Sequence, residues 1–107
     1  MKVSHINDMK GGWFIGNFEP SLFKNDNFEV AYKFFDKDEF HEPHTHKIAT
    51  EYNYLAKGKL SVQGKTIESG QIFIFQPGEL SDVVFLEKCE IVVIKTPCIK
   101  NDKFTHE

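Results

Sequence analysis

Hydrophobic residues fall in many short runs that are separated by glycine, proline and Asn-Asp turn signals. Residues 28–35 carry an aromatic or aliphatic side chain at every second position, all on one face, which is typical of a β-strand. Residues 72–75 are continuously apolar, which indicates a buried strand. Further short strands are predicted at residues 12–18, 44–46, 51–56, 60–62, 66–67, 83–86 and 91–94. No segment shows the period of a long helix.

Turn residues predict how some of these strands pair. The dipeptide Gln63-Gly64 favours a hairpin between residues 60–62 and residues 66–67. Residues 83–86 and 91–94 are predicted to form the last hairpin, around a polar turn. Many short strands with frequent turns are typical of a sandwich or barrel, so we predict an all-β fold of antiparallel strands.

Composition favours one folded domain. The chain of 107 residues is 40% hydrophobic and contains 11 Phe, which is ample apolar material for a packed core. Two domains would each have a core too small to be stable, so residues 1–107 are assigned to a single domain. The mostly polar residues 99–107 are expected to trail along the surface, as chain ends often do.

Charge and hydropathy argue against several classes of function. The formal net charge is −3, and no Lys/Arg cluster is interleaved with aromatic residues, so no nucleic-acid partner is expected. No apolar run approaches the roughly 18–20 residues that span a bilayer, and no signal-peptide pattern opens the chain. We therefore expect no membrane association and a cytoplasmic location, where Cys89 and Cys98 stay reduced.

Two histidines separated by one residue offer the clearest candidate chemistry. Pro43 disfavours a helical conformation at Glu42, so the segment that holds His44 and His46 is expected to be extended. Side chains on a strand alternate between faces, and both imidazoles should therefore project to the same side. One metal ion could contact both rings, together with the carboxylate of Glu51 on the next strand.

The spacing of these residues resembles the first signature of the cupin superfamily, in which two histidines are followed by a glutamate and a glycine. The matching residues are His44, His46, Glu51 and Gly58. The resemblance implies a small antiparallel jelly-roll β-barrel with a metal site at His44, His46 and Glu51. It covers roughly residues 40–96.

The second signature of that superfamily is kept only in part. Gly70 and Gly78 are in register with its glycines, and the apolar run between them also agrees. Ser81 stands where the family usually has its last metal-binding histidine, and Phe85 stands where it usually has an asparagine. Serine is a poor metal ligand, so the resemblance implies a site with three protein ligands instead of four.

Two imidazoles and one carboxylate suit Zn²⁺, Fe²⁺, Mn²⁺ or Ni²⁺ and do not distinguish among them. Such a site keeps coordination positions for water or a ligand. Strand alternation turns Asn53 and Ser81 toward the same interior, and two carboxylates flank the turn at the predicted barrel mouth. The predicted ligand pocket therefore includes Asn53, Ser81, Glu79 and Asp82. Regular alternation points His41 away from this pocket, toward solvent.

These features favour a cupin-like protein that binds one divalent metal and binds or acts on a small oxygen-bearing ligand. If it is an enzyme, an oxygenase, a sugar isomerase and an epimerase all fit, because the fold does not define the reaction. A metal-independent module that binds a carbohydrate-like ligand through Asn53 and Ser81 is the alternative, and a purely structural dimer is a third. By the same strand alternation, Tyr52 and Tyr54 face outward, where they indicate a homodimer contact.

Overall fold

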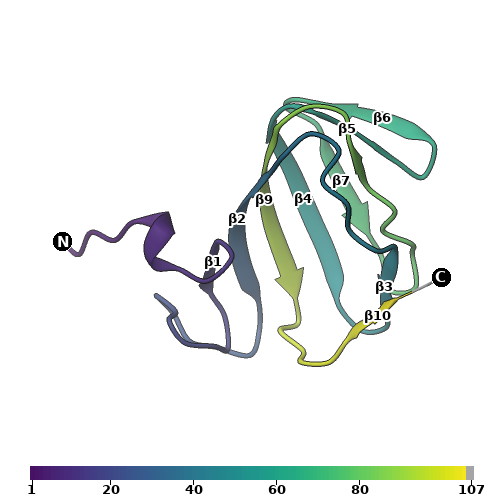
Figure 1. Ribbon diagram of the computed structural model, residues 1–107. Coiled ribbons are helices and arrows are strands. Elements are labelled where there is room, and N and C mark those ends of the chain that lie inside the picture. Colours follow the sequence, from purple (N-terminus) through teal and green to yellow (C-terminus); the bar gives the residue numbers. More distant parts are fainter. Residues whose placement is uncertain (106–107) are drawn as a thin grey trace.

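The computed structural model describes residues 1–105, which form antiparallel β-strands and one short 3-10 helix (Figure 1). The elements are η1 (Ile6–Asp8), β1 (Trp13–Ile15), β2 (Glu29–Phe35), β3 (His44–His46), β4 (Thr50–Lys57), β5 (Lys59–Val62), β6 (Lys65–Glu68), β7 (Ile72–Phe75), β8 (Val84–Phe85), β9 (Cys89–Thr96) and β10 (Lys103–Thr105). The large sheet has the order β1-β2-β9-β4-β7, a smaller sheet has the order β6-β5-β8, and β3 pairs with β10. The predicted all-β fold is confirmed.

The hydrophobic core lies between the large sheet and the smaller sheet. Leu55 and Ile91 point inward from the large sheet and pack against Leu60 of β5 and Phe85 of β8. Leu55 and Leu60 have no exposed surface, and burying such a side chain stabilises the fold by about 1.5–3 kcal/mol. On β4 the inward positions become polar toward the β3 end, at Asn53, so the core gives way to a polar cavity there.

The predicted hairpin between residues 83–86 and 91–94 is wrong. Strand β8 pairs with β5, whereas β9 lies in the middle of the large sheet between β2 and β4. The backbone N–H groups of Leu86 and Glu87 donate to the carbonyl of Lys59, which ties the end of β8 to β5. The polar turn has no glycine to close a tight hairpin, and each strand finds its partner far away in the sequence.

Gly58, one of the four residues that match the first cupin signature, joins β4 to β5 with a φ of +102°. A Cβ atom at this position would lie 2.3 Å from the carbonyl oxygen of Lys88 and 2.8 Å from Sγ of Cys89. Both the backbone conformation and the close approach of the β8–β9 connection therefore require glycine. Gly70 has a φ of +93°, but a Cβ atom there would meet nothing within 4 Å, so only its turn conformation favours glycine.

The prediction that residues 99–107 trail along the surface is wrong in part. Lys103, Phe104 and Thr105 are exposed, but they form β10, which pairs in register with β3. Asp102 is only 5% exposed, and it contacts the turn between β3 and β4. Residues 106 and 107 lie outside the described residues.

Cys89 is buried and Cys98 is half-buried, and both are free thiols. Within residues 1–105 there is no helix with the length and apolar character needed to cross a membrane.

Candidate metal centre

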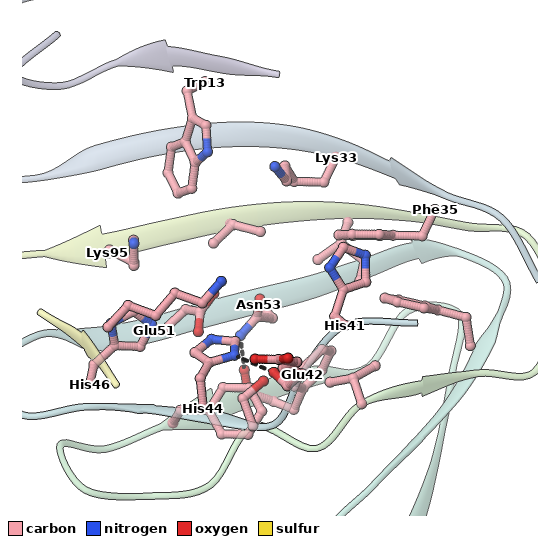
Figure 2. Close-up of a pocket in the computed structure, with 18 residues that line it drawn as sticks. Trp13, Lys33, Phe35, His41, Glu42, His44, His46, Glu51, Asn53 and Lys95 are labelled. Atoms are coloured by element: carbon pink, nitrogen blue, oxygen red, sulfur yellow. Dashed lines mark hydrogen bonds between the residues drawn. The ribbon is translucent and has the colours of Figure 1, made fainter. Parts of the chain in front are cut away.

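The three predicted ligands converge at one end of the cavity (Figure 2). His44 and His46 project from β3, and Glu51 projects from β4. One side-chain donor atom of each residue lies within 4.8 Å of the donor atoms of the other two. The imidazole rings stand perpendicular, with their centroids 5.2 Å apart. Alternation along β3 places both imidazoles on one face, as predicted, and the turn to β4 brings the carboxylate of Glu51 close to them.

His44 is held in the state that a metal ligand needs. Its Nδ1 lies 3.2 Å from the carbonyl oxygen of Glu42, and since a carbonyl only accepts, Nδ1 carries the proton and donates. The Nε2 lone pair is then free to bind a cation. Burial lowers the pKa of His44, which favours the neutral ring even though the hydrogen bond from Nδ1 acts in the opposite direction.

His46 is more deeply buried, with 7% of its surface exposed. Burial, with the positive charge of Lys95 as the next cause, lowers the pKa of His46 to about 4. The imidazole is therefore neutral near pH 7 and able to donate its lone pair. Its Nδ1 is 3.9 Å from Oδ2 of Asp102, which is too long for a hydrogen bond but close enough for the carboxylate to act on the ring's charge.

Glu51 supplies the negative charge of the site. The pKa of its carboxyl group is raised, because burial outweighs the effect of nearby positive charges, led by Lys95 and Lys103, which act to lower it. None of the ion pairs within residues 1–105 involves this carboxylate. A half-buried carboxylate that faces a cavity outside any ion pair is suited to a cation.

Asp102 fixes the turn that separates the histidines from Glu51. Its carboxylate accepts hydrogen bonds from the backbone N–H groups of Lys47, Ile48 and Ala49, at 2.9 to 3.1 Å. Burial alone would raise the pKa of Asp102, but these donors hold it below its usual range. Sequence reasoning missed this residue because it lies more than 50 positions from the turn that it caps.

The site opens into a cavity of about 360 Å³. Asn53 and Ser81 line it as predicted, and Ser81 is bridged to His44 by two backbone hydrogen bonds of 2.8 and 3.1 Å. Glu79 and Asp82 do not line it, which corrects their predicted place in the pocket. Both are used locally instead, where Glu79 accepts from the N–H of Gln76 and Asp82 accepts from the N–H of Gln63.

His41 is exposed, as predicted, but it does not point away from the pocket. It is 46% exposed, yet it lines the cavity, with its ring edge-on to Phe35 at a centroid distance of 5.3 Å (Figure 2). Alternation does not apply to it because the residues between β2 and β3 are not in a strand. Its Nε2 lies 2.6 Å from Oε2 of Glu39, so the ring is held at the cavity rim.

The cavity is also lined by residues that were not predicted there, among them Trp13, Lys33, Lys95 and Lys103. Lys33 and Lys95 occupy inward positions of β2 and β9, so the alternation of side chains along these strands is the signal that could have placed them in the cavity. Lys95 is directly opposite Glu51 across the β9–β4 pair.

No protein-family model and no curated protein matches the sequence. Solved structures are similar in fold. A protein with a double-stranded β-helix domain from Klebsiella pneumoniae is 12% identical, with a TM-score of 0.69 over 100% of this chain and 99% of that chain. The DMSP lyase DddQ from Ruegeria pomeroyi is 13% identical, with a TM-score of 0.68 over 82% of this chain and 47% of that chain.

A cupin-2 domain protein from Shewanella frigidimarina is 14% identical to this chain, with a TM-score of 0.55 over 67% of this chain and 72% of that chain. At such low identities the likeness concerns the fold alone. The chain therefore has the double-stranded β-helix fold that cupin-domain proteins share, which is the fold that the sequence resemblance implied.

Proposed function

We propose that this protein binds one divalent transition-metal ion through His44, His46 and Glu51 and uses it to hold a small oxygen-bearing ligand in the cavity. The observation that carries this proposal is the convergence of the three donor atoms within 4.8 Å of one another. A bound divalent ion would supply Lewis acidity, which polarises a ligand oxygen. Another chain with the same fold is a lyase, so the fold is compatible with an enzyme.

The donor set fits Zn²⁺, Fe²⁺, Mn²⁺ or Ni²⁺. Both imidazoles are neutral near pH 7, and no ion pair within residues 1–105 competes for the Glu51 carboxylate. The apolar walls of the cavity, which include Phe73 and Phe75, restrict water around the ligand. Asn53 and Ser81 add polar groups that orient a ligand beside the metal site.

Elemental analysis of protein purified without a metal-affinity tag tests the proposal. We expect close to one equivalent of a divalent transition metal per chain, and we expect His46→Ala and Glu51→Gln each to weaken metal binding by about 100-fold or more. Glu68→Gln is the matched control, because Glu68 is an exposed glutamate on β6. A folded wild-type protein that neither contains nor takes up a divalent metal would contradict the proposal and favour a metal-independent binding module.

We further propose that the outer face of the large sheet forms a homodimer contact. Two rows of apolar residues run across four neighbouring strands on this face: Val30, Ile94, Tyr52 and Ile74, and then Tyr32, Val92, Tyr54 and Ile72. Ile72 is 65% exposed and Tyr54 is 42% exposed, although both are large and apolar. A continuous apolar surface of this kind is typical of an interface between subunits.

Sedimentation velocity tests the dimer. The wild-type protein is expected to sediment as a dimer at micromolar concentration, and Ile72→Lys is expected to shift it to a monomer, because the new charge would be buried in the contact. Val84→Lys is the control, since Val84 is 49% exposed but lies on the smaller sheet. A monomeric wild-type protein, or a dimer that persists in Ile72→Lys, would exclude this contact.

A further inference from the structure

A group of positive charges and one indole ring lines the cavity beside the metal centre (Figure 2). The ring of Trp13 has the Nζ atom of Lys95 at 5.0 Å from its centroid and the Nζ atom of Lys33 at 5.6 Å. The three residues come from adjacent strands β1, β2 and β9 of the large sheet. They form one surface, which we call the ammonium face.

The two lysines of the ammonium face differ in their partners. Lys95 forms an ion pair with Glu29 at 3.1 Å. Lys33 is half-buried, and it has no ion pair with any carboxylate of residues 1–105. Burial, followed by repulsion from Lys95 and Lys103, lowers its pKa. A half-buried ammonium group without a carboxylate partner loses hydration that an anionic ligand can replace.

We infer that the cavity takes a small organic acid, whose carboxylate binds to Lys33 and Lys95 at the ammonium face while another oxygen of the same molecule reaches the metal centre. The metal end of this inference rests on the proposed function. The ammonium end rests only on the lysines, the indole ring and the cavity that they line.

The charges and the apolar lining of the cavity both favour this class of ligand. Three lysines line the cavity, against two carboxylates, Glu42 and Glu51, of which Glu51 is the metal ligand in our proposal. Apolar side chains, which include Val93 and Phe73, also line the cavity. A short carbon skeleton with charged oxygens at its ends suits a cavity that combines ammonium groups, a metal centre and apolar side chains.

The ammonium face also predicts coupling between the two ends. Lys33, Lys95 and Lys103 all act electrostatically on Glu51. In the absence of an anion, these charges oppose the binding of a cation. An organic anion neutralises them and should tighten metal binding, and by thermodynamic linkage the metal should tighten anion binding by the same factor.

Fluorescence provides the test, because Trp13 is the single tryptophan of the chain and lies within the ammonium face. Succinate is titrated into the full-length protein with and without bound Zn²⁺, and succinamide serves as an uncharged probe of the same size. We expect succinate to change the Trp13 emission and to bind at least about tenfold more tightly than succinamide. Lys33→Gln should weaken succinate binding by about 10- to 100-fold, and Lys33→Arg should restore most of it.

Lys33→Gln should strengthen metal binding, although it weakens succinate binding. Removing one positive charge should strengthen Zn²⁺ binding in the absence of succinate by about two- to fivefold. A loss of folding would weaken the binding of both ligands, so opposite changes in the affinities for succinate and Zn²⁺ identify an electrostatic role. Lys57→Gln is the control, because Lys57 is exposed with 73% of its side chain accessible, and it should change neither affinity.

The outcomes separate this inference from the proposed function. Equal binding of succinate to the wild type and to Lys33→Gln would overturn the inference, whether or not Zn²⁺ binds. Succinate binding that depends on Lys33 in a protein that binds no Zn²⁺ would uphold the ammonium face and refute the metal centre.

Discussion

Asp102→Ala is expected to lower the free energy of unfolding by about 3–5 kcal/mol, because it leaves three backbone N–H groups without their acceptor. These groups belong to the turn that joins β3 to β4, and that turn sets the position of Glu51 relative to His46. We therefore also expect Zn²⁺ affinity to fall by about 10- to 100-fold. Urea denaturation of the metal-free protein measures the first effect, and Zn²⁺ titration measures the second.

Asp102→Asn separates the acceptor role of this residue from its size. The amide keeps one oxygen acceptor but loses the charge and the second acceptor, so its loss of stability should be about half that of alanine. Asp36→Ala is the matched control, because Asp36 is an exposed aspartate directly after β2. A loss below about 1 kcal/mol in Asp102→Ala would show that the turn holds its conformation without this carboxylate.

The spacing of the ligands could be predicted from the sequence because it depends on local geometry. Alternation along an extended segment places His44 and His46 on one face whatever the rest of the fold does. The sequence contains no comparable signal for contacts between distant parts of the chain. The pairing of β10 with β3 brings Asp102 to the site, and nothing in the local pattern around Asp102 indicates a buried acceptor.

Strand β2 shows why the ammonium face was missed. Its large apolar residues, such as Tyr32 and Phe34, alternate regularly, which normally marks the buried face of a strand. In the structure these residues lie on the outer face of the large sheet, and Phe34 is 59% exposed. Ala31 and Lys33 point inward instead. The interior at this end is a polar cavity, so hydrophobic periodicity alone does not identify the inner face.

The wrong hairpin has a related cause. Local turn signals favour pairing between neighbours in the sequence, but β9 pairs with β2 and β4 along most of its length. Cys89, Ile91 and Val93 fill the core from this central position. The free energy gained by burying β9 in the middle of a sheet exceeds what a two-stranded hairpin provides.

Ser81→His is expected to strengthen Zn²⁺ binding by about 10- to 100-fold, since it adds a fourth ligand where the cupin signature usually has a histidine. Ser81 lines the cavity and is bridged to His44 through the backbone, so its side chain starts next to the metal centre. A neutral imidazole leaves the net charge of the site unchanged. Isothermal titration with Zn²⁺ measures the affinity, and Val84→His is the control because it adds an imidazole at an exposed position of β8.

The added ligand should also change how the protein responds to an organic anion. A fourth imidazole occupies a coordination position that the wild-type site leaves for a ligand oxygen. Succinate should then still bind through Lys33, but it should no longer tighten the binding of Zn²⁺ as strongly as in the wild type. If Ser81→His binds Zn²⁺ no more tightly than Val84→His does, then Ser81 does not face the metal centre and the match to the second cupin signature at this position is wrong.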